Sequence, residues 1–305
     1  MAAVGVLYFI LARYGMQGLL RLNEPWRFLP FQFRGGFGIN QPWRVLVAGG
    51  ILFISLFGGF RSVPLTLALL CILLFFREGL HRTAWAPVIV LIGILTFAVA
   101  LPFANQLPFT VQRSLSFLPI QIDPEAKKDA EVSTEWRLRM WEQVLPMVPQ
   151  YLLIGKGYAI DAKEQAREEG LEGTAKVGVE NFEGALRAGD YHNGPLSLII
   201  PLGIFGAISF VWFLVVAFRL LINNQRHGDP TNLRVNNFLL ALFTMKVLWF
   251  LAAYGSFQND LAVFTGIVGL SAAINGGMCK PTPSVKPNPA YQPFRLPKPL
   301  RTAGA

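Results

Sequence analysis

The sequence predicts an all-α polytopic membrane protein with about seven transmembrane helices and one large external (periplasmic) loop that contains amphipathic helices. Of its 305 residues, 53% are apolar and only 15% are charged, unlike a soluble domain of this length. Uncharged stretches recur along the chain, and the 23 residues from Leu196 to Phe218 are enough to cross a bilayer. The formal charge of +9 does not indicate nucleic acid, because the basic residues form no single patch with interleaved aromatics.

Seven apolar segments are candidate spans, and several are shorter than the roughly 20 residues that a perpendicular helix needs. They are Ala2 to Leu20 (interrupted by Arg13), Val45 to Phe60, Ser62 to Phe76, Ala86 to Phe103, Leu196 to Phe218, Phe238 to Tyr254 and Leu261 to Cys279. The first has no basic leader and resembles neither a signal peptide nor a good first anchor. We therefore expect helices to be missing upstream, through a misplaced start site or a shortened chain.

Basic residues in the short connections set the predicted orientation. Residues 21–44, 77–85 and 219–237 carry arginines and alternate along the chain as cytoplasmic loops should. Residues 104–195 carry ten Lys/Arg and fourteen Asp/Glu and no cysteine, so this loop is expected outside the membrane and without disulfides. The three histidines are scattered, which predicts no Cys/His metal cluster.

Four regions follow from these patterns. They are N-terminal transmembrane helices in 1–103, the external periplasmic loop in 104–195, C-terminal transmembrane helices in 196–279, and a basic, proline-rich cytoplasmic tail in 280–305. The tail has seven prolines and no acid, so we expect it to be extended, poorly ordered and attracted to anionic membrane lipids.

Two arginines are candidate ligands for an anion on the outer side. Arg61 lies in an external turn just before Pro64, which suits the first turn of a helix, so an anion would be stabilised between the guanidinium and the helix dipole. Diphosphate is the candidate, and contact with lipid headgroups is the alternative. Arg137 and Trp141 share one helix face, where the ring can support the guanidinium by a cation–π contact.

Arg137 belongs to an amphipathic helix expected to begin at Ser133 or Thr134, to end near Pro149 and to lie on the membrane surface. Its apolar positions recur at helical spacing, namely Trp136, Met140, Val144, Leu145 and Val148.

His192 lies where the external loop meets the span that begins at Leu196. An ionisable ring at a membrane boundary is a candidate functional group, and the alternative is a histidine that only satisfies the helix N-terminus. Lys246, near the middle of its span, either lines a cavity or is paired within the bundle.

Three groups of residues together resemble a known family. They are Gly58-Gly-Phe-Arg-Ser62; Arg137-Leu-Arg-Met-Trp141 followed by Leu152-Leu-Ile-Gly-Lys-Gly157; and His192-Asn193 followed by Leu196 and Gly203-Ile-Phe-Gly206. In this order and spacing, over about residues 40–275, they resemble the bacterial O-antigen ligase and O-antigen polymerase family of membrane glycosyltransferases, which includes O-linked protein oligosaccharyltransferases.

The resemblance implies transfer of a glycan from undecaprenyl diphosphate to a hydroxyl of a glycan, lipid or protein acceptor outside the cytoplasmic membrane, without cofactor, metal or nucleotide sugar. By position, Arg61 and Arg137 would hold the diphosphate and His192 would be the essential histidine. Candidate supporting residues are Asn193, Asp190, Trp141 and Lys246. Asp260, with Gln258 and Asn259, is either a contact for sugar hydroxyls or an ordinary polar turn.

The implied chemistry suits these side chains. Guanidiniums stabilise the charge that a diphosphate leaving group gains as its bond to the sugar breaks. A neutral imidazole can accept the proton of the attacking hydroxyl near pH 7, with Asp190 or Glu183 orienting it, whereas a protonated one would add a third cation to the diphosphate site.

One departure from the family is Pro201, which stands where members often carry an acid and which should kink the helix. Two other functions stay open: a transporter or flippase of lipid-linked sugars, and a truncated, non-catalytic paralogue. The chain shows no convincing internal repeat of the kind that transporters favour.

Overall fold

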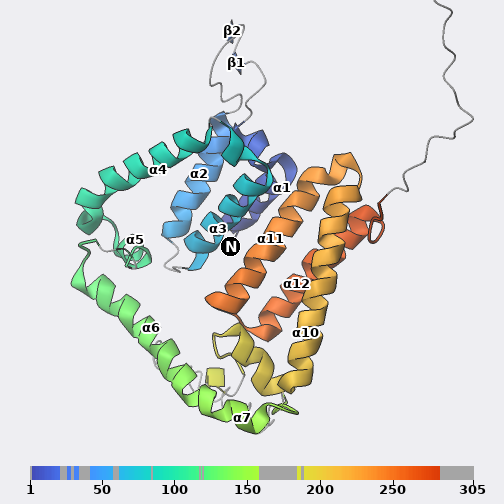
Figure 1. Ribbon diagram of the computed structural model, residues 1–305. Helices are drawn as coiled ribbons and strands as arrows, with labels where there is room; N and C mark the ends of the chain where they lie inside the picture. The colour runs from blue at the N-terminus through green and yellow to red at the C-terminus, as the bar shows by residue number, and fades with distance from the viewer. Residues whose placement is uncertain are drawn as a thin grey trace, which may run out of the picture.

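The computed structural model describes residues 2–20, 26–28, 31–33, 42–57, 62–83, 85–116, 118, 120–157, 184–186 and 189–281. Helices and their connections make up almost all of these residues, as predicted (Figure 1). The exception is a short antiparallel hairpin of β1 (Trp26–Phe28) and β2 (Phe31–Phe33), in which Phe28 lies opposite Phe31. It falls in a connection for which the apolar pattern predicts no element.

Each predicted apolar segment overlaps one helix over most of its length. These helices are α1 (Ala2–Leu20), α2 (Pro42–Leu56), α3 (Ser62–Arg77), α4 (Trp85–Ala100), α10 (Gly194–His227), α11 (Leu233–Ala252) and α12 (Phe257–Asn275). In the part of the chain that the structure describes, three helical stretches are long and apolar enough to cross a membrane, at Gly194–His227, Pro230–Ala252 and Phe257–Asn275. Shorter apolar stretches lie in α2, α3 and α4. The count of seven spans therefore stays a prediction.

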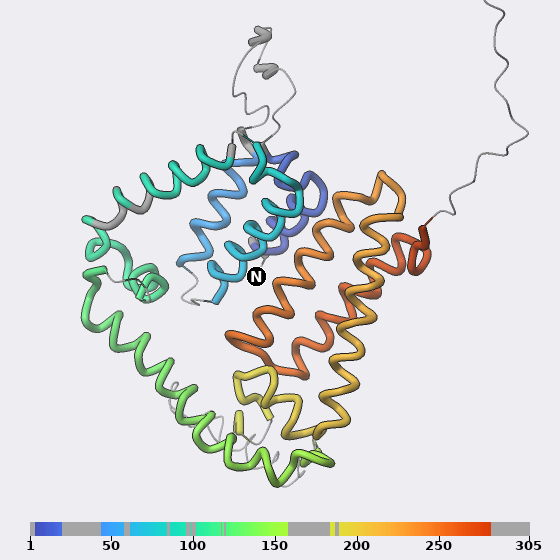
Figure 2. The backbone as a smooth tube through the Cα atoms, viewed as in Figure 1, coloured from blue at the N-terminus to red at the C-terminus, as the bar shows by residue number. Residues whose placement is uncertain are grey.

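Between α4 and α10, the chain forms a peripheral layer. Figure 2 shows it running from α4 around one side of the molecule and returning to the start of α10. Its elements are η2 (Leu101–Gln106), α5 (Phe109–Ser114), α6 (Pro124–Val144), η3 (Leu145–Met147) and α7 (Val148–Tyr151), and two more 3₁₀ turns, η1 (Leu80–Arg82) and η4 (Pro230–Asn232), lie elsewhere.

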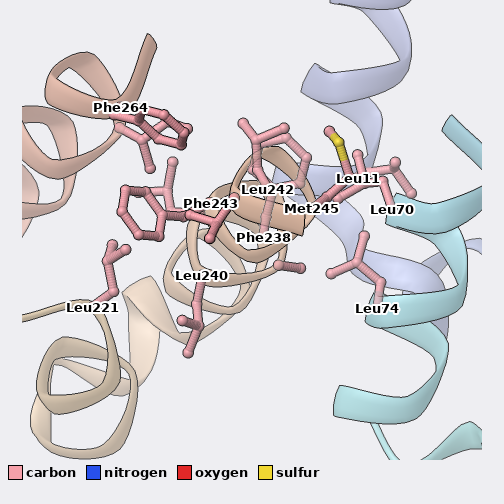
Figure 3. Close-up of a cluster of buried hydrophobic side chains, with 14 of the residues drawn as sticks. Leu11, Leu70, Leu74, Leu221, Phe238, Leu240, Leu242, Phe243, Met245 and Phe264 are labelled. Carbon is pink, nitrogen blue, oxygen red and sulfur yellow. The ribbon is translucent and has the colours of Figure 1, made fainter. Parts of the chain in front are cut away.

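Helix α11 is at the centre of the bundle and packs against α1, α3, α10 and α12. Figure 3 shows Leu242 and Met245 on the side of α11 that faces α1 and α3, whereas Phe243 faces Phe264 of α12 and Leu221 of α10. Helix α11 carries apolar side chains on all its faces. This pattern is typical of a helix that is buried on all sides, whereas an amphipathic helix buries only one face.

A buried polar network ties α10, α11 and α12 together at one end of the bundle. The amides of Asn236 and Asn275 bond reciprocally, at 3.0 and 2.9 Å. Asn224 donates to the hydroxyl of Ser271 at 3.1 Å and accepts from the backbone N–H of Cys279 at 2.8 Å. Interhelical hydrogen bonds of this kind hold helices together where lipid supplies no hydrophobic driving force.

Helix α6 begins ten residues before its predicted start, so the expectation of a cap at Ser133 or Thr134 is wrong. The cap is Asp123, whose carboxylate accepts from the N–H of Glu125 at 2.8 Å, with a proline at the start of the helix. Thr134 lies inside the helix, and its hydroxyl donates to the carbonyl one turn earlier.

The far end of α6 packs on the start of α10. Five buried side chains form this second cluster, which contains Met140, Val144, Tyr191, Leu196 and Ile200. Four of the five predicted apolar positions thus pack on this cluster, since Trp136 and Val148 are partly buried against it. Leu145 does not pack on this cluster. It lies directly after α6, which ends at Val144, and Leu145 is 55% exposed.

Helix α10 is interrupted at the predicted kink, and residues 152–157 fill the interruption. Gly203 leaves helical geometry with φ 65° and ψ −167°, two residues after Pro201. The backbone N–H groups of Lys156 and Gly157 donate to the carbonyls of Ile200 and Pro201 at 2.7 and 2.9 Å. On the other side of the break, the N–H of Ile204 donates to the carbonyl of residue 152 at 2.7 Å. The backbone groups freed by the break are therefore satisfied within the protein.

Gly155 and Gly203 make this contact possible. Gly155 has φ 84°, and a Cβ on it would overlap the carbonyl oxygen of Pro201. A Cβ on Gly203 would lie 2.6 Å from the carbonyl oxygen of Leu153. The glycines of the two motif segments thus meet in space.

We expect Gly155→Ala to lower the thermal unfolding midpoint of the detergent-solubilised protein, because it combines a left-handed backbone with an overlap. Gly79→Ala is the control for strain alone, since Gly79 has φ 75° and open space around its Cβ, and should cost about 1–2 kcal/mol. Gly266→Ala, in open space within α12, should leave the midpoint unchanged or raise it slightly, because alanine favours a helix more than glycine does. Equal midpoints for the Gly155 and Gly79 variants would contradict the close contact with α10.

Candidate functional site

His192 lies immediately outside the first turn of α10. The residue that caps the helix is Asn193, whose side-chain oxygen accepts from the N–H of Leu196 at 3.1 Å. The imidazole is therefore not needed to satisfy the helix N-terminus. Among the described residues, His192 is the one non-glycine with positive φ, 50°. Such a backbone costs on the order of 1 kcal/mol and persists only where the surroundings hold it, which is common at functional sites.

Two aromatic rings hold the imidazole in place. The ring centroid of Trp136, from α6, lies 4.9 Å from that of His192, and that of Tyr254 lies 4.8 Å away. The side chain of His192 keeps 23% of its surface exposed. The ring is thus fixed in position while part of the side chain stays accessible.

Tyr254 reaches His192 because two glycines let the end of α11 approach the start of α10. A Cβ on Gly194 would overlap the carbonyl oxygen of Phe250, and one on Gly255 would lie 2.8 Å from the Cα of Gly194. A further link is the hydroxyl of Ser197, which accepts from the backbone N–H of Phe257 at 3.0 Å. The start of α10 and the connection between α11 and α12 are therefore held together at the candidate site.

Asp190 orients the imidazole. Its Oδ1 lies 3.2 Å from Nδ1 of His192. Because a carboxylate only accepts hydrogen bonds, Nδ1 is the donor, and in a neutral ring Nε2 is then the acceptor. Burial acts to raise the pKa of Asp190, but the hydrogen bonds and charge of His192 and a hydrogen bond with Ser256 outweigh it, so this pKa lies below its ordinary value.

Arg137 faces the same tyrosine as His192. Its guanidinium carbon lies 5.7 Å from the ring centroid of Tyr254, which is within cation–π range. The ring contact that the structure gives for Arg137 is thus with Tyr254 and not with the predicted Trp141, whose indole N–H donates to the carbonyl of Tyr191 at 3.0 Å and so holds the backbone next to His192. No carboxylate among the described residues forms an ion pair with Arg137.

Burial and nearby charges change the pKa of the Tyr254 hydroxyl. Burial and the negative charge of Asp190 raise its pKa, while Arg137 opposes them. The phenol therefore stays protonated and can donate a hydrogen bond at neutral pH.

Lys246 and Asp260 pair with each other across α11 and α12, with Nζ and Oδ1 3.5 Å apart. The other oxygen of Asp260 accepts from the backbone N–H of Ser256 at 3.1 Å. Of the two predictions for Lys246, pairing within the bundle is the one that this contact supports.

Some predicted residues cannot be placed. Arg61 and Glu183 lie outside the described residues, as does residue 282 and the chain after it. Conversely, the apolar and motif patterns gave no role to Tyr254 and Ser256, which complete the surroundings of His192. Both are more than sixty residues away along the chain, and their only local sign is the small residue Gly255 beside them.

Within the described ranges, no group of three or more His, Cys, Asp and Glu residues has the arrangement of a metal site. The polar groups around His192 are instead one imidazole, one carboxylate, one phenol and one guanidinium. Such a set can bind an anion beside a proton acceptor.

Comparison with known protein families gives one match, to a family described as O-antigen ligase, over residues 45–211 and thus more than half of the chain. No curated protein and no solved structure matches. The matched residues begin in α2 and end in α10, so they include Arg137, Asp190 and His192, whereas Tyr254 lies beyond them.

The lowered pKa of Asp190 predicts a pH-dependent effect of its removal. A carboxylate with a depressed folded-state pKa adds stability above its ordinary value, 3.8, and that contribution is lost as the pH falls through the folded value. Asp190→Asn should therefore lower the unfolding midpoint at pH 7 but much less at pH 3. Glu142→Gln, at an exposed position of α6, should change neither midpoint. An equal loss at both pH values for Asp190→Asn would show that its charge is not what matters.

Proposed function

Because the chain belongs to the O-antigen ligase family of membrane glycosyltransferases, we propose that it transfers a glycan from undecaprenyl diphosphate to an acceptor hydroxyl on the outer face of the cytoplasmic membrane. The observation that carries this proposal is that His192 and Arg137 both contact the ring of Tyr254. A proton acceptor and a cation for the leaving group are then close to one another, as such a transfer requires.

In the proposed reaction, His192 acts as the base. The acceptor oxygen forms a bond to the anomeric carbon while the bond from that carbon to the diphosphate oxygen breaks. The hydroxyl proton goes to Nε2, and undecaprenyl diphosphate leaves with the electrons of the broken bond. Asp190 stabilises the imidazolium that forms, because its carboxylate already accepts from Nδ1.

The role of His192 as a third cation for the diphosphate is less favoured by this arrangement. A protonated ring next to Asp190 forms a pair that is close to neutral, so it adds little net charge to an anion site. The oriented tautomer, by contrast, is what a base needs.

Arg137 is the proposed ligand of the diphosphate within the described residues, together with Arg61, which lies outside them. A guanidinium can give two parallel hydrogen bonds to phosphate oxygens. Tyr254 positions Arg137 without neutralising its charge. Arg137 can therefore stabilise the negative charge that develops on the leaving group, and this stabilisation is larger in the transition state than in the ground state. Lys246 is already paired with Asp260 and is not assigned to the diphosphate.

The wider setting is proposed on the same basis. Residues 104–195 would be periplasmic and the C-terminus cytoplasmic, with membrane lipids around the apolar helices. The acceptor would be a glycan, lipid or protein hydroxyl, and the chemistry of the site does not require a metal or cofactor.

We expect His192→Asn to lower the rate of glycan transfer by about 100-fold or more, the usual contribution of a general base. Asparagine tolerates the left-handed backbone of this position, so the substitution removes the imidazole with little added strain. His81→Asn, at an exposed histidine of η1, is the matched control and should be fully active. The assay uses purified protein, lipid-linked glycan and candidate acceptors. Transfer by His192→Asn within about threefold of wild type would exclude the base role.

Arg137→Lys should weaken the apparent affinity for the lipid-linked donor by about tenfold or more, because lysine keeps the charge but loses the two-pronged donor geometry. Arg139→Lys is the matched control, since Arg139 lies two residues away, is exposed and pairs with Glu135. Titrating both variants with the lipid-linked donor distinguishes the contribution of Arg137 to donor affinity from that of Arg139. If both weaken donor binding equally, Arg137 acts only as part of a basic surface.

A further inference from the structure

A second cationic site lies at the other end of α11. A cavity of about 610 Å³ opens between the second half of α1, the end of α3 and the start of α11. Three arginines line it, Arg13, Arg77 and Arg234. Since α11 has 20 residues, this cavity is about 30 Å from Tyr254, which follows the other end of the helix (Figure 1).

The one carboxylate in this cavity is already engaged. Helix α1 is interrupted at Gly15, where φ is 65° and ψ is 178°. The two oxygens of Glu78 accept from the freed backbone N–H groups of Met16 and Gln17 at 3.0 and 2.7 Å. Glu78 thus acts as a cap for α1, and a Cβ on Gly15 would lie 2.7 Å from it.

The three arginines outnumber the one carboxylate in the cavity, Glu78, whose charge interacts with that of Arg234. Within the described residues, none of the three arginines forms an ion pair. Arg226 adds a like charge that acts on Arg77. An anion bound in the cavity would reduce the repulsion among these positive charges.

Asn237 supplies a neutral polar group on the same wall. Its buried Oδ1 has no hydrogen-bond partner in the described structure. An unpaired acceptor of this kind is costly unless a ligand donates to it. A phosphate ester with a neighbouring hydroxyl would satisfy both the guanidiniums and the amide.

We propose that this cavity binds a phosphate group, with Arg77 and Arg234 as its main ligands and Asn237 as the acceptor for an adjacent hydroxyl. The phosphate comes from the headgroup of an anionic lipid such as phosphatidylglycerol or from a free phosphate compound. The site is independent of the glycan-transfer reaction, since it shares no residue with the surroundings of His192.

The test is native mass spectrometry of the purified full-length protein with phosphatidylglycerol, phosphatidylcholine or inorganic pyrophosphate. Arg77→Gln/Arg234→Gln should lower the affinity for the bound phosphate compound by roughly tenfold per arginine. The control Arg82→Gln/Arg219→Gln removes two exposed arginines that do not line the cavity and should leave binding unchanged. Both residues of the test pair are also exposed, so unliganded unfolding midpoints should match wild type.

Selective binding of phosphatidylglycerol that only the Arg77/Arg234 variant loses supports a lipid headgroup. Binding of pyrophosphate with the same dependence supports a free phosphate compound. The proposal is overturned if neither anion binds more tightly than phosphatidylcholine, or if the two double variants lose binding equally.

Discussion

The interruption of α10 is the constraint on which the rest of the arrangement depends. A helix that loses its hydrogen bonds at Pro201 and Gly203 must find partners for the freed backbone groups, and residues 152–157 provide them. This exchange attaches the peripheral layer to the bundle. It also fixes the first turns of α10, and therefore the position of His192 at its start.

The same geometry explains how a single tyrosine comes to lie between an imidazole and a guanidinium. Met140 and Val144 pack α6 on the first turns of α10, which carries Arg137 toward His192. Gly194 and Gly255 let the end of α11 approach from the other side with Tyr254. Within the described residues, the electrostatic result is a guanidinium that forms no ion pair, next to an oriented histidine. Such a pairing favours a ligand that brings negative charge close to a proton to be removed.

The helix positions and the kink could be predicted from the sequence because they depend on local patterns of residues. Apolar runs located seven helices, Ala2–Leu20 to the residue, because burial and hydrogen bonding of apolar segments leave few alternatives to a helix. The kink near Pro201 also follows from one residue. The start of α6 differs from the prediction because Ser133 and Thr134, directly before the apolar positions, are also possible caps, whereas the helix begins at the equally recognisable cap of Asp123 and Pro124.

What could not be predicted depends on tertiary contacts. The Tyr254 ring approaches His192, and the Ser256 side chain approaches Asp190, across more than sixty residues. The pairing of Lys246 with Asp260 depends on how α11 meets α12. Neither hydropathy nor spacing carries that information. The swap of ring partners is an example: Trp141 has the correct helical spacing from Arg137, yet its N–H bonds the backbone of Tyr191.

We propose that Arg137 and His192 serve one bound diphosphate-linked glycan. A structure of the full-length protein with an undecaprenyl diphosphate glycan tests it most directly. The account predicts phosphate oxygens within hydrogen-bond distance of the Arg137 guanidinium and Nε2 of His192 facing the anomeric carbon. A diphosphate bound away from Arg137, or an imidazole turned from the sugar, would contradict it.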